Sequence, residues 1–102
     1  WEKAKAFDGS AVIGDFLPKT LFSSVENLTF ELTNNGKTVQ KGNTDLMIWK
    51  IDELISFASQ YFTLKIGDVI FTGTPAGVAA VKPNDVLEGF LEDKKLFRIQ
   101  VK

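Results

Sequence analysis

The feature that most limits the fold of this chain is a series of short segments rich in β-branched and aromatic residues, separated by Gly, Pro, Asn and Asp. Segments of this kind predict strands joined by tight turns. We expect strands at Lys3–Phe7, Ala11–Phe16, Leu28–Thr33, Lys37–Lys41, Asp68–Thr72, Val86–Leu91 and Leu96–Val101. The sequence therefore predicts a mostly β fold.

The clearest strand pair is the one that spans residues 28–41. Asn34, Asn35 and Gly36 stand at its centre, and these residue types accept positive φ angles at low cost, which a tight hairpin turn requires. We therefore expect the two arms to be antiparallel. In the last expected strand apolar and polar residues alternate, which indicates a sheet with one buried and one exposed face.

One segment has the periodicity of a helix. Apolar residues recur at helical spacing in Ile51–Phe62, and Asp52 and Glu53 fall in the first turn, where the helix dipole favours carboxylates. We expect this helix to pack against the sheet. With the strands it predicts an α+β domain with one core, because 102 residues are too few for two.

Charge and composition restrict the function. The 12 basic and 13 acidic residues are spread evenly, so no basic stripe is available for a nucleic-acid partner. The apolar runs are far shorter than the ~20 residues that span a bilayer, so we expect no membrane partner. The absence of cysteine fits a cytoplasmic location, which we expect. Cys and His are both absent, so chemistry within the chain depends on Lys, carboxylates or hydroxyls.

The most unusual local sequence is the run from Phe71 to Val78, with two glycines, two threonines and a proline. A loop of this composition can expose backbone N–H groups and hydroxyls that suit a carboxylate or another small anion. The alternative is a purely structural turn, with Gly73 and Gly77 at positive φ around Pro75. Composition alone favours the structural alternative, because the run matches neither a phosphate loop nor a dinucleotide fingerprint.

Lys5 is a second candidate, because it lies between alanines in an expected strand. A lysine fixed in a buried strand could stabilise an enolate or an oxyanion. The alternative is an outward-facing lysine on an edge strand, which is the commoner arrangement.

Other polar groups are more simply explained by structure. In the stretch that begins at Gln40, Asn43 or Thr44 could touch a substrate, but hydrogen bonds to nearby backbone are the favoured role. The acidic pairs Asp52/Glu53 and Glu92/Asp93 suit a helix start and a turn, and neither has a further ligand at metal-binding spacing.

Three segments, taken in chain order, carry a resemblance to a known family. They are Trp1–Phe7, Gly42–Ile48 with the helix that follows, and Leu64–Val78 with the turn and strand start at Lys82–Val86. These segments are similar to the successive C-terminal motifs of the fumarylacetoacetate hydrolase family, and Leu64–Val78 is the most specific of them. The resemblance covers the whole chain and implies that residues 1–102 are the C-terminal portion of a catalytic domain.

The resemblance implies an incomplete mixed β-sheet roll, a homodimer and a Mg²⁺ or Mn²⁺ cofactor. Family members act on small-molecule 2-oxo and 1,3-diketo acids by C–C bond hydrolysis, decarboxylation or keto–enol isomerisation. The metal stabilises the enolate that forms when a C–C or C–H bond breaks. Its carboxylate ligands are expected upstream of these residues, so we expect this segment alone to be inactive.

Two positions of the family's site carry over to this chain. Lys5 matches the active-site lysine beside the metal, and Thr74 matches the threonine whose hydroxyl holds a substrate carboxylate, with Gly73 allowing close approach of the backbone. Gly9 stands where some relatives carry threonine, and Asn84 where glycine is common. The competing hypothesis is a non-catalytic β-domain used for binding or structural support.

Overall fold

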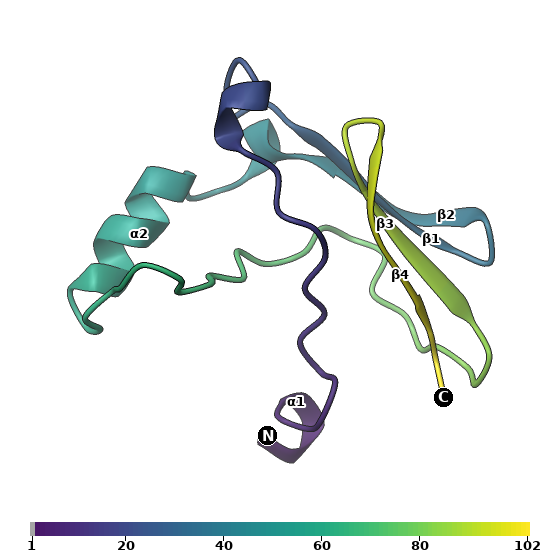
Figure 1. The fold of residues 1–102 in the computed structure, drawn as a ribbon. Helices are drawn as coiled ribbons and strands as arrows, with labels where there is room; N and C mark the ends of the chain where they lie inside the picture. Colours follow the sequence, from purple (N-terminus) through teal and green to yellow (C-terminus); the bar gives the residue numbers. More distant parts are fainter. Residues whose placement is uncertain (1) are drawn as a thin grey trace.

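The computed structural model describes residues 2–102, and its centre is one antiparallel sheet. The strands are β1 (Thr29–Asn34), β2 (Lys37–Asn43), β3 (Val86–Leu91) and β4 (Lys94–Gln100), in the spatial order β2-β1-β3-β4 (Figure 1). All three neighbouring pairs are antiparallel. The mostly β prediction with one main helix is therefore confirmed, and the sheet of residues 2–102 holds no parallel pair.

The helices are one regular element and three short ones. The main helix is α2 (Ile51–Ser59), and the short ones are α1 (Glu2–Lys5), η1 (Lys19–Leu21) and η2 (Thr44–Leu46). Within the described part of the chain, none of them is long and apolar enough to cross a membrane. The helix expected at 51–62 begins where predicted and ends one turn earlier.

The hairpin of β1 and β2 forms as its turn residues predict. Asn35 and Gly36 adopt φ angles of 53° and 84°, and Asn34 pairs with Lys37 across the turn. Both positive angles are the ones that a two-residue hairpin connection needs to match the twist of its strands. The predicted antiparallel arrangement is confirmed.

Asp85 fastens this hairpin turn to the start of β3. Its carboxylate accepts hydrogen bonds from the side-chain amides of Asn34 (3.1 Å) and Asn35 (3.0 Å) and from the backbone N–H of Lys82 (2.9 Å). The Lys82 N–H, followed by the two amides, holds the pKa of Asp85 below its ordinary value, because each donor stabilises the charged carboxylate. Asn84 adopts a φ of 75°, which explains why glycine suits its position.

Three predicted strands are wrong. Lys3–Phe7 overlaps helix α1, and neither Ala11–Phe16 nor Asp68–Thr72 forms a strand. Glu, Lys and Ala are good helix formers, which accounts for α1. The other two segments form no continuous pairing with a strand of the sheet, and a strand needs a partner for its backbone groups. Only Asp15 donates its N–H to a sheet residue, the carbonyl of Leu96 (2.9 Å).

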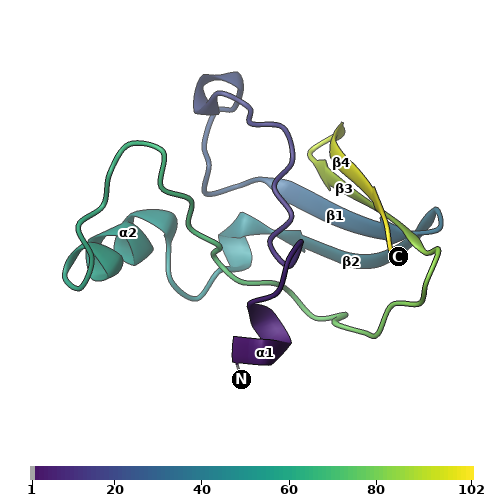
Figure 2. The ribbon, with the colours of Figure 1, turned by 60° about the horizontal axis from the view of Figure 1, so that its bottom comes forward.

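The prediction that the helix packs against the sheet is also wrong. Figures 1 and 2 both show α2 standing apart from the four strands. No residue of α2 is buried, and on it Ile55 and Phe57 are 42% and 62% exposed. Its amphipathic pattern is real, but residues 2–102 cover its apolar face only in part, since Ile51, Leu54 and Ala58 are half-buried.

The described chain is more open than a compact domain of its mass. Its accessible surface is 8377 Å², whereas a folded 11.3 kDa monomer exposes about 5,700 Å². Its radius of gyration is 14.8 Å against about 12.8 Å expected for 102 residues. Leu28 is the only buried hydrophobic residue among residues 2–102. Phe7, Phe16 and Trp49 are among the exposed large apolar residues.

Candidate functional site

The glycine- and threonine-rich loop at residues 72–78 lies in the long segment between α2 and β3, which is the light green trace entering β3 in Figure 1. Gly73 and Gly77 adopt φ angles of 105° and 109°, so both take the left-handed conformation that favours glycine. The structural prediction for these glycines is therefore confirmed. It does not compete with a binding role, because the same conformation shapes the loop around Thr74.

The loop is fastened to strand β2 at Thr74 and Pro75. The side-chain amide of Gln40 donates to the Thr74 hydroxyl (2.8 Å) and to the Pro75 carbonyl (3.0 Å). Gly77 approaches the same strand so closely that a Cβ atom there would collide with the carbonyl oxygen of Val39. Two consecutive residues of β2 therefore set the position of the loop.

A cavity of about 250 Å³ lies between this loop and the sheet. The loop contributes Gly73, Thr74 and Pro75 to its wall. The sheet contributes the other lining residues, which are Phe30, Glu31, Leu32, Gln40, Gly89, Phe90, Leu96 and Phe97. The wall therefore combines mostly apolar residues with the hydroxyl of Thr74, the amide of Gln40 and Glu31, and a mainly apolar lining with a few polar groups is typical of small-molecule sites.

Four of the sheet residues that line this cavity form one row across the sheet. Leu32 of β1 pairs with Gln40 on one side and with Gly89 on the other, and Gly89 pairs with Phe97. Directly paired residues share a face of the sheet. A Cβ atom on Gly89 would collide with the ring of Phe97, so the missing side chain leaves room for that ring.

The structure brings two of the three predicted site residues together and leaves the third apart. Gly73 and Thr74 line the cavity, whereas Lys5 is not among its lining residues. Lys5 lies in α1, which Figure 1 shows below the strands and away from the loop. The side chains of Lys3, Ala4 and Lys5 are all exposed.

The favoured structural role of the polar stretch after β2 is confirmed. The side-chain oxygen of Asn43 accepts a hydrogen bond from the backbone N–H of Asp45 (2.9 Å). The Thr44 hydroxyl accepts from the Leu28 N–H (2.8 Å) and donates to the Val25 carbonyl (2.9 Å). These hydrogen bonds connect residues 25–28 to the end of β2. They account for the side chains of Asn43 and Thr44 without a contact to a substrate.

Metal-ligating residues do not converge within the described chain. No group of three or more Asp and Glu side chains in residues 2–102 is placed to hold a metal ion. Asp52 and Glu53 lie in the first turn of α2, and Glu92 and Asp93 form the turn between β3 and β4, as predicted. These residues therefore do not fit a divalent cation by themselves.

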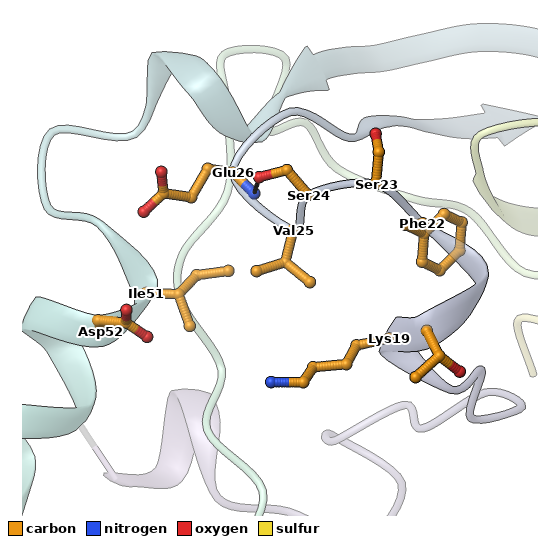
Figure 3. Close-up of a pocket in the computed structure, with 9 residues that line it drawn as sticks. Lys19, Phe22, Ser23, Ser24, Val25, Glu26, Ile51 and Asp52 are labelled. Atoms are coloured by element: carbon orange, nitrogen blue, oxygen red, sulfur yellow. Dashed lines mark hydrogen bonds between the residues drawn. The ribbon is translucent and has the colours of Figure 1, made fainter.

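A second cavity, of about 380 Å³, lies between η1 and the start of α2 (Figure 3). In Figure 3 the Lys19 side chain extends toward Ile51 and Asp52, and Val25 also faces the cavity. The lining combines one ammonium group with the carboxylates of Glu26 and Asp52. None of the residues predicted for the site lines this cavity, which sits away from the loop.

Gln40 is the site residue that the sequence did not single out. It was named only as the first residue of a polar stretch. Gln40 pairs with the apolar residue Leu32 across the hairpin. A polar side chain on an apolar face needs a hydrogen-bond partner, and this pairing is the sequence signal that could have identified Gln40. That partner lies 34 residues further along the chain, so the pattern alone could not identify it.

The class that fold and site define is a mostly β domain that carries a hydroxyl-bearing glycine loop over one face of its sheet. The family model described as fumarylacetoacetate hydrolase C-terminal matches residues 1–101. The chain therefore belongs to the fumarylacetoacetate hydrolase family, and the resemblance read from its motifs is confirmed.

Among curated relatives, the chain is 45% identical to the mitochondrial oxaloacetate tautomerase fahd-1 of Caenorhabditis elegans over 92% of its length. It is 48% identical to the oxaloacetate tautomerase YcgM of Escherichia coli over 85% of its length. It spans only 44% and 40% of those proteins. One relative is named as mitochondrial and the other is bacterial, so the cytoplasmic location stays an expectation.

Solved structures show the same fold. A Yersinia pestis protein assigned to the family is 43% identical with a TM-score of 0.92, covering 100% of this chain and 48% of that one. A Pseudomonas aeruginosa fumarylpyruvate hydrolase in complex with Mn²⁺ and pyruvate is 35% identical with a TM-score of 0.90, covering 99% and 43%. These relatives support an enzyme family that uses a divalent metal on small keto acids.

Proposed function

We propose that residues 1–102 are the C-terminal portion of the catalytic domain of a divalent-metal-dependent enzyme, and that the complete protein acts on a short 2-oxo acid through an enolate. The observation that carries this proposal is the Thr74 hydroxyl, which is held by Gln40 at the edge of a small cavity. The names of the two tautomerases and of the hydrolase with bound pyruvate support the substrate class.

In this proposal Thr74 and Gly73 bind the substrate carboxylate. A hydroxyl donates a hydrogen bond to a carboxylate, and a hydrogen bond to a charged group is stronger than one between neutral groups. Gly73 has no neighbour within 4 Å of the position its Cβ would occupy, so its backbone is open to close approach. The loop thus supplies orientation, while the bond-breaking chemistry is assigned to groups outside it.

Lys5 is proposed to stabilise the negative oxygen of the enolate. Its ammonium group is a fixed donor and a full charge, which is effective where charge develops during the reaction. The Lys5 side chain is exposed, and we propose that contacts with other parts of the complete protein set its position beside the substrate.

The divalent cation is proposed to be Mg²⁺ or Mn²⁺, held by carboxylates that do not belong to residues 2–102. The chemistry of this chain agrees with that division, since no group of three or more acidic side chains among residues 2–102 is placed to hold a metal ion. The Mn²⁺ complex of the Pseudomonas aeruginosa hydrolase supports the metal class.

For the reaction itself we propose keto–enol tautomerisation of oxaloacetate. The enol form arises when a C3–H bond breaks and the C2 oxygen gains a proton, so no oxidant or further reactant is needed. The names of two relatives at 45% and 48% identity favour this reaction over hydrolysis. Fumarylpyruvate hydrolysis is the second candidate, because a structural neighbour at 35% identity carries that name.

The test is turnover by the complete protein with Mg²⁺ or Mn²⁺ on oxaloacetate, acylpyruvates and fumarylpyruvate. Thr74→Val is expected to raise the KM about ten- to a hundredfold, as the loss of a hydrogen bond to a charged group does. Lys5→Ala is expected to lower kcat about a hundredfold, as the loss of an oxyanion donor does. Thr63→Val and Lys3→Ala are matched controls at exposed positions and should behave as wild type.

Each arm of this test has a result that contradicts it. Near-normal kinetics of Lys5→Ala would remove Lys5 from the mechanism, and an unchanged KM of Thr74→Val would remove the carboxylate contact. Absence of turnover on all three substrate classes, with pyruvate still bound, would instead support the non-catalytic binding domain.

The complete protein is also proposed to be a homodimer. The described chain exposes far more surface than a compact monomer of its mass, and some of that surface is available to a second copy. Sedimentation of the complete protein at micromolar concentration should give the mass of two chains, and the mass of one chain would contradict the proposal.

A further inference from the structure

We propose that Gln40 is a positioning residue that sets the direction of the Thr74 hydroxyl and thereby makes it a hydrogen-bond donor toward substrate. The inference rests on the proposed function of Thr74 and adds to it a residue from a different strand. Its basis is the pair of hydrogen bonds from the Gln40 amide to Thr74 and Pro75.

The orientation of the Gln40 amide follows from its second partner. The Pro75 carbonyl oxygen can only accept a hydrogen bond, so the atom that faces it at 3.0 Å is the amide nitrogen and not the oxygen. The same NH₂ group then directs its other hydrogen to the Thr74 oxygen at 2.8 Å. Thr74 is thus an acceptor toward Gln40.

A hydroxyl that accepts from one side keeps its own hydrogen for another partner. Within the described residues, Thr74 donates this hydrogen to no protein acceptor. Thr74 also lines the cavity between the loop and the sheet. An anion in that cavity could therefore receive the hydrogen bond without competing with another acceptor of this chain.

Strand β2 gives Gln40 a fixed base. Gln40 pairs with Leu32 in the central strand β1 and is partly buried. Its neighbour Val39 touches Gly77, so the loop meets β2 both at residues 74–75 and at residue 77. Groups mounted on paired strands are held more accurately than groups mounted on loops. The paired strand therefore fixes the Gln40 amide, and the amide in turn fixes the direction of the Thr74 hydroxyl.

Two substitutions at residue 40 separate this role from simple packing. Gln40→Met keeps the length of the side chain and removes both donors. Gln40→Glu keeps the shape but presents a carboxylate that only accepts, so the Thr74 hydrogen turns toward it and away from the cavity. A packing role predicts that the isosteric glutamate is the milder change, whereas the positioning role predicts the reverse.

The experiment measures pyruvate binding by calorimetry, and oxaloacetate KM and kcat, for the complete protein with Mg²⁺. Gln40→Met should weaken pyruvate binding about three- to tenfold and raise KM equally, with kcat changed less than twofold. Gln40→Glu should weaken binding at least as much as Thr74→Val does. Gln60→Met, at the exposed end of α2, is the matched control and should bind pyruvate as wild type does.

A double variant decides whether Gln40 acts through Thr74. If it does, Gln40→Met combined with Thr74→Val should bind pyruvate within about twofold of Thr74→Val alone, because the hydroxyl to be oriented is already gone. Effects that simply multiply would overturn the inference. So would normal binding by both Gln40 variants beside weakened binding by Thr74→Val, and that result would leave the proposed function intact. Normal binding by Thr74→Val would overturn both proposals together.

Discussion

The sheet and the long segments around it respond differently to the same kinds of sequence pattern. Each strand of the sheet has a partner within residues 2–102, and there the predicted bounds agree with the structure to within about two residues. Residues 65–74 carry an apolar, β-branched run and yet are exposed throughout and form no strand. A local pattern therefore defines structure in this chain only where the same residues also supply the surface against which it packs.

The largest expected effect concerns the chain as a whole. Expressed alone, residues 1–102 should lack a cooperative unfolding transition and should bind a hydrophobic dye, because Leu28 is the only buried hydrophobic residue of the described chain. The complete protein should unfold cooperatively. Urea titration followed by far-ultraviolet circular dichroism makes the measurement. A sharp, concentration-independent transition of residues 1–102 would show that the sheet suffices as a core and would remove the contrast between the two regions.

The second effect compares, in the complete protein, the buried leucine just before β1 with an exposed leucine of the short helix η2. Leu28→Ala should lower the free energy of unfolding by about 2–5 kcal/mol, because it leaves a cavity beside the sheet. Leu46 is 79% exposed, and Leu46→Ala should change that free energy by less than about 0.5 kcal/mol. Urea denaturation measures both changes in the free energy of unfolding, provided that the dependence of that free energy on urea concentration is the same for wild type and variants. Equal costs would mean that Leu46 is covered in the complete protein and that exposure within residues 2–102 is a poor guide to its packing.

The fold prediction succeeded where an element is determined by residues close together in sequence, and it failed where the element depends on distant ones. The β1–β2 hairpin was predictable because Asn35 and Gly36 determine it locally, through their tolerance of positive φ. The start of α2 was predictable for the same reason, since its apolar period is local. The predicted packing of α2 against the sheet failed because an amphipathic stripe indicates that something covers it but not what does.

The site prediction divides in the same way. Gly73 and Thr74 were placed correctly in one loop because they are neighbours in sequence, and resemblance to a family supplied their chemistry. Gln40 was missed because its partner is remote in sequence. Lys5 was expected in a strand and lies in a short exposed helix, because residues 6–102 provide no strand to pair with it.

The third effect compares two glycines of the site loop, one that touches the sheet and one that does not. Gly77→Ala should lower the free energy of unfolding by about 2–4 kcal/mol, because positive φ is strained for alanine and its Cβ would meet the Val39 carbonyl. Gly73→Ala should cost about 1–2 kcal/mol, since only the φ strain applies. Thermal and urea unfolding of the complete protein measure both. A Gly73 variant as unstable as the Gly77 variant would show that something outside this chain packs against Gly73.

The smallest effect tests the best-defined polar cluster of the sheet region through its pH dependence. The Lys82 N–H and the Asn34 and Asn35 amides hold the pKa of Asp85 below its ordinary value, so the folded state binds a proton less readily than the unfolded state. The resulting stabilisation is fully present above about pH 4 and is lost as the pH falls through the lowered pKa. Wild type should therefore be slightly more stable than Asp85→Asn at pH 6, and the difference should shrink toward pH 2. The difference in stability between wild type and Asp85→Asn could instead stay constant from pH 6 to pH 2. That result would mean that the negative charge on Asp85 does not stabilise the turn, and that the order of the sheet does not depend on it.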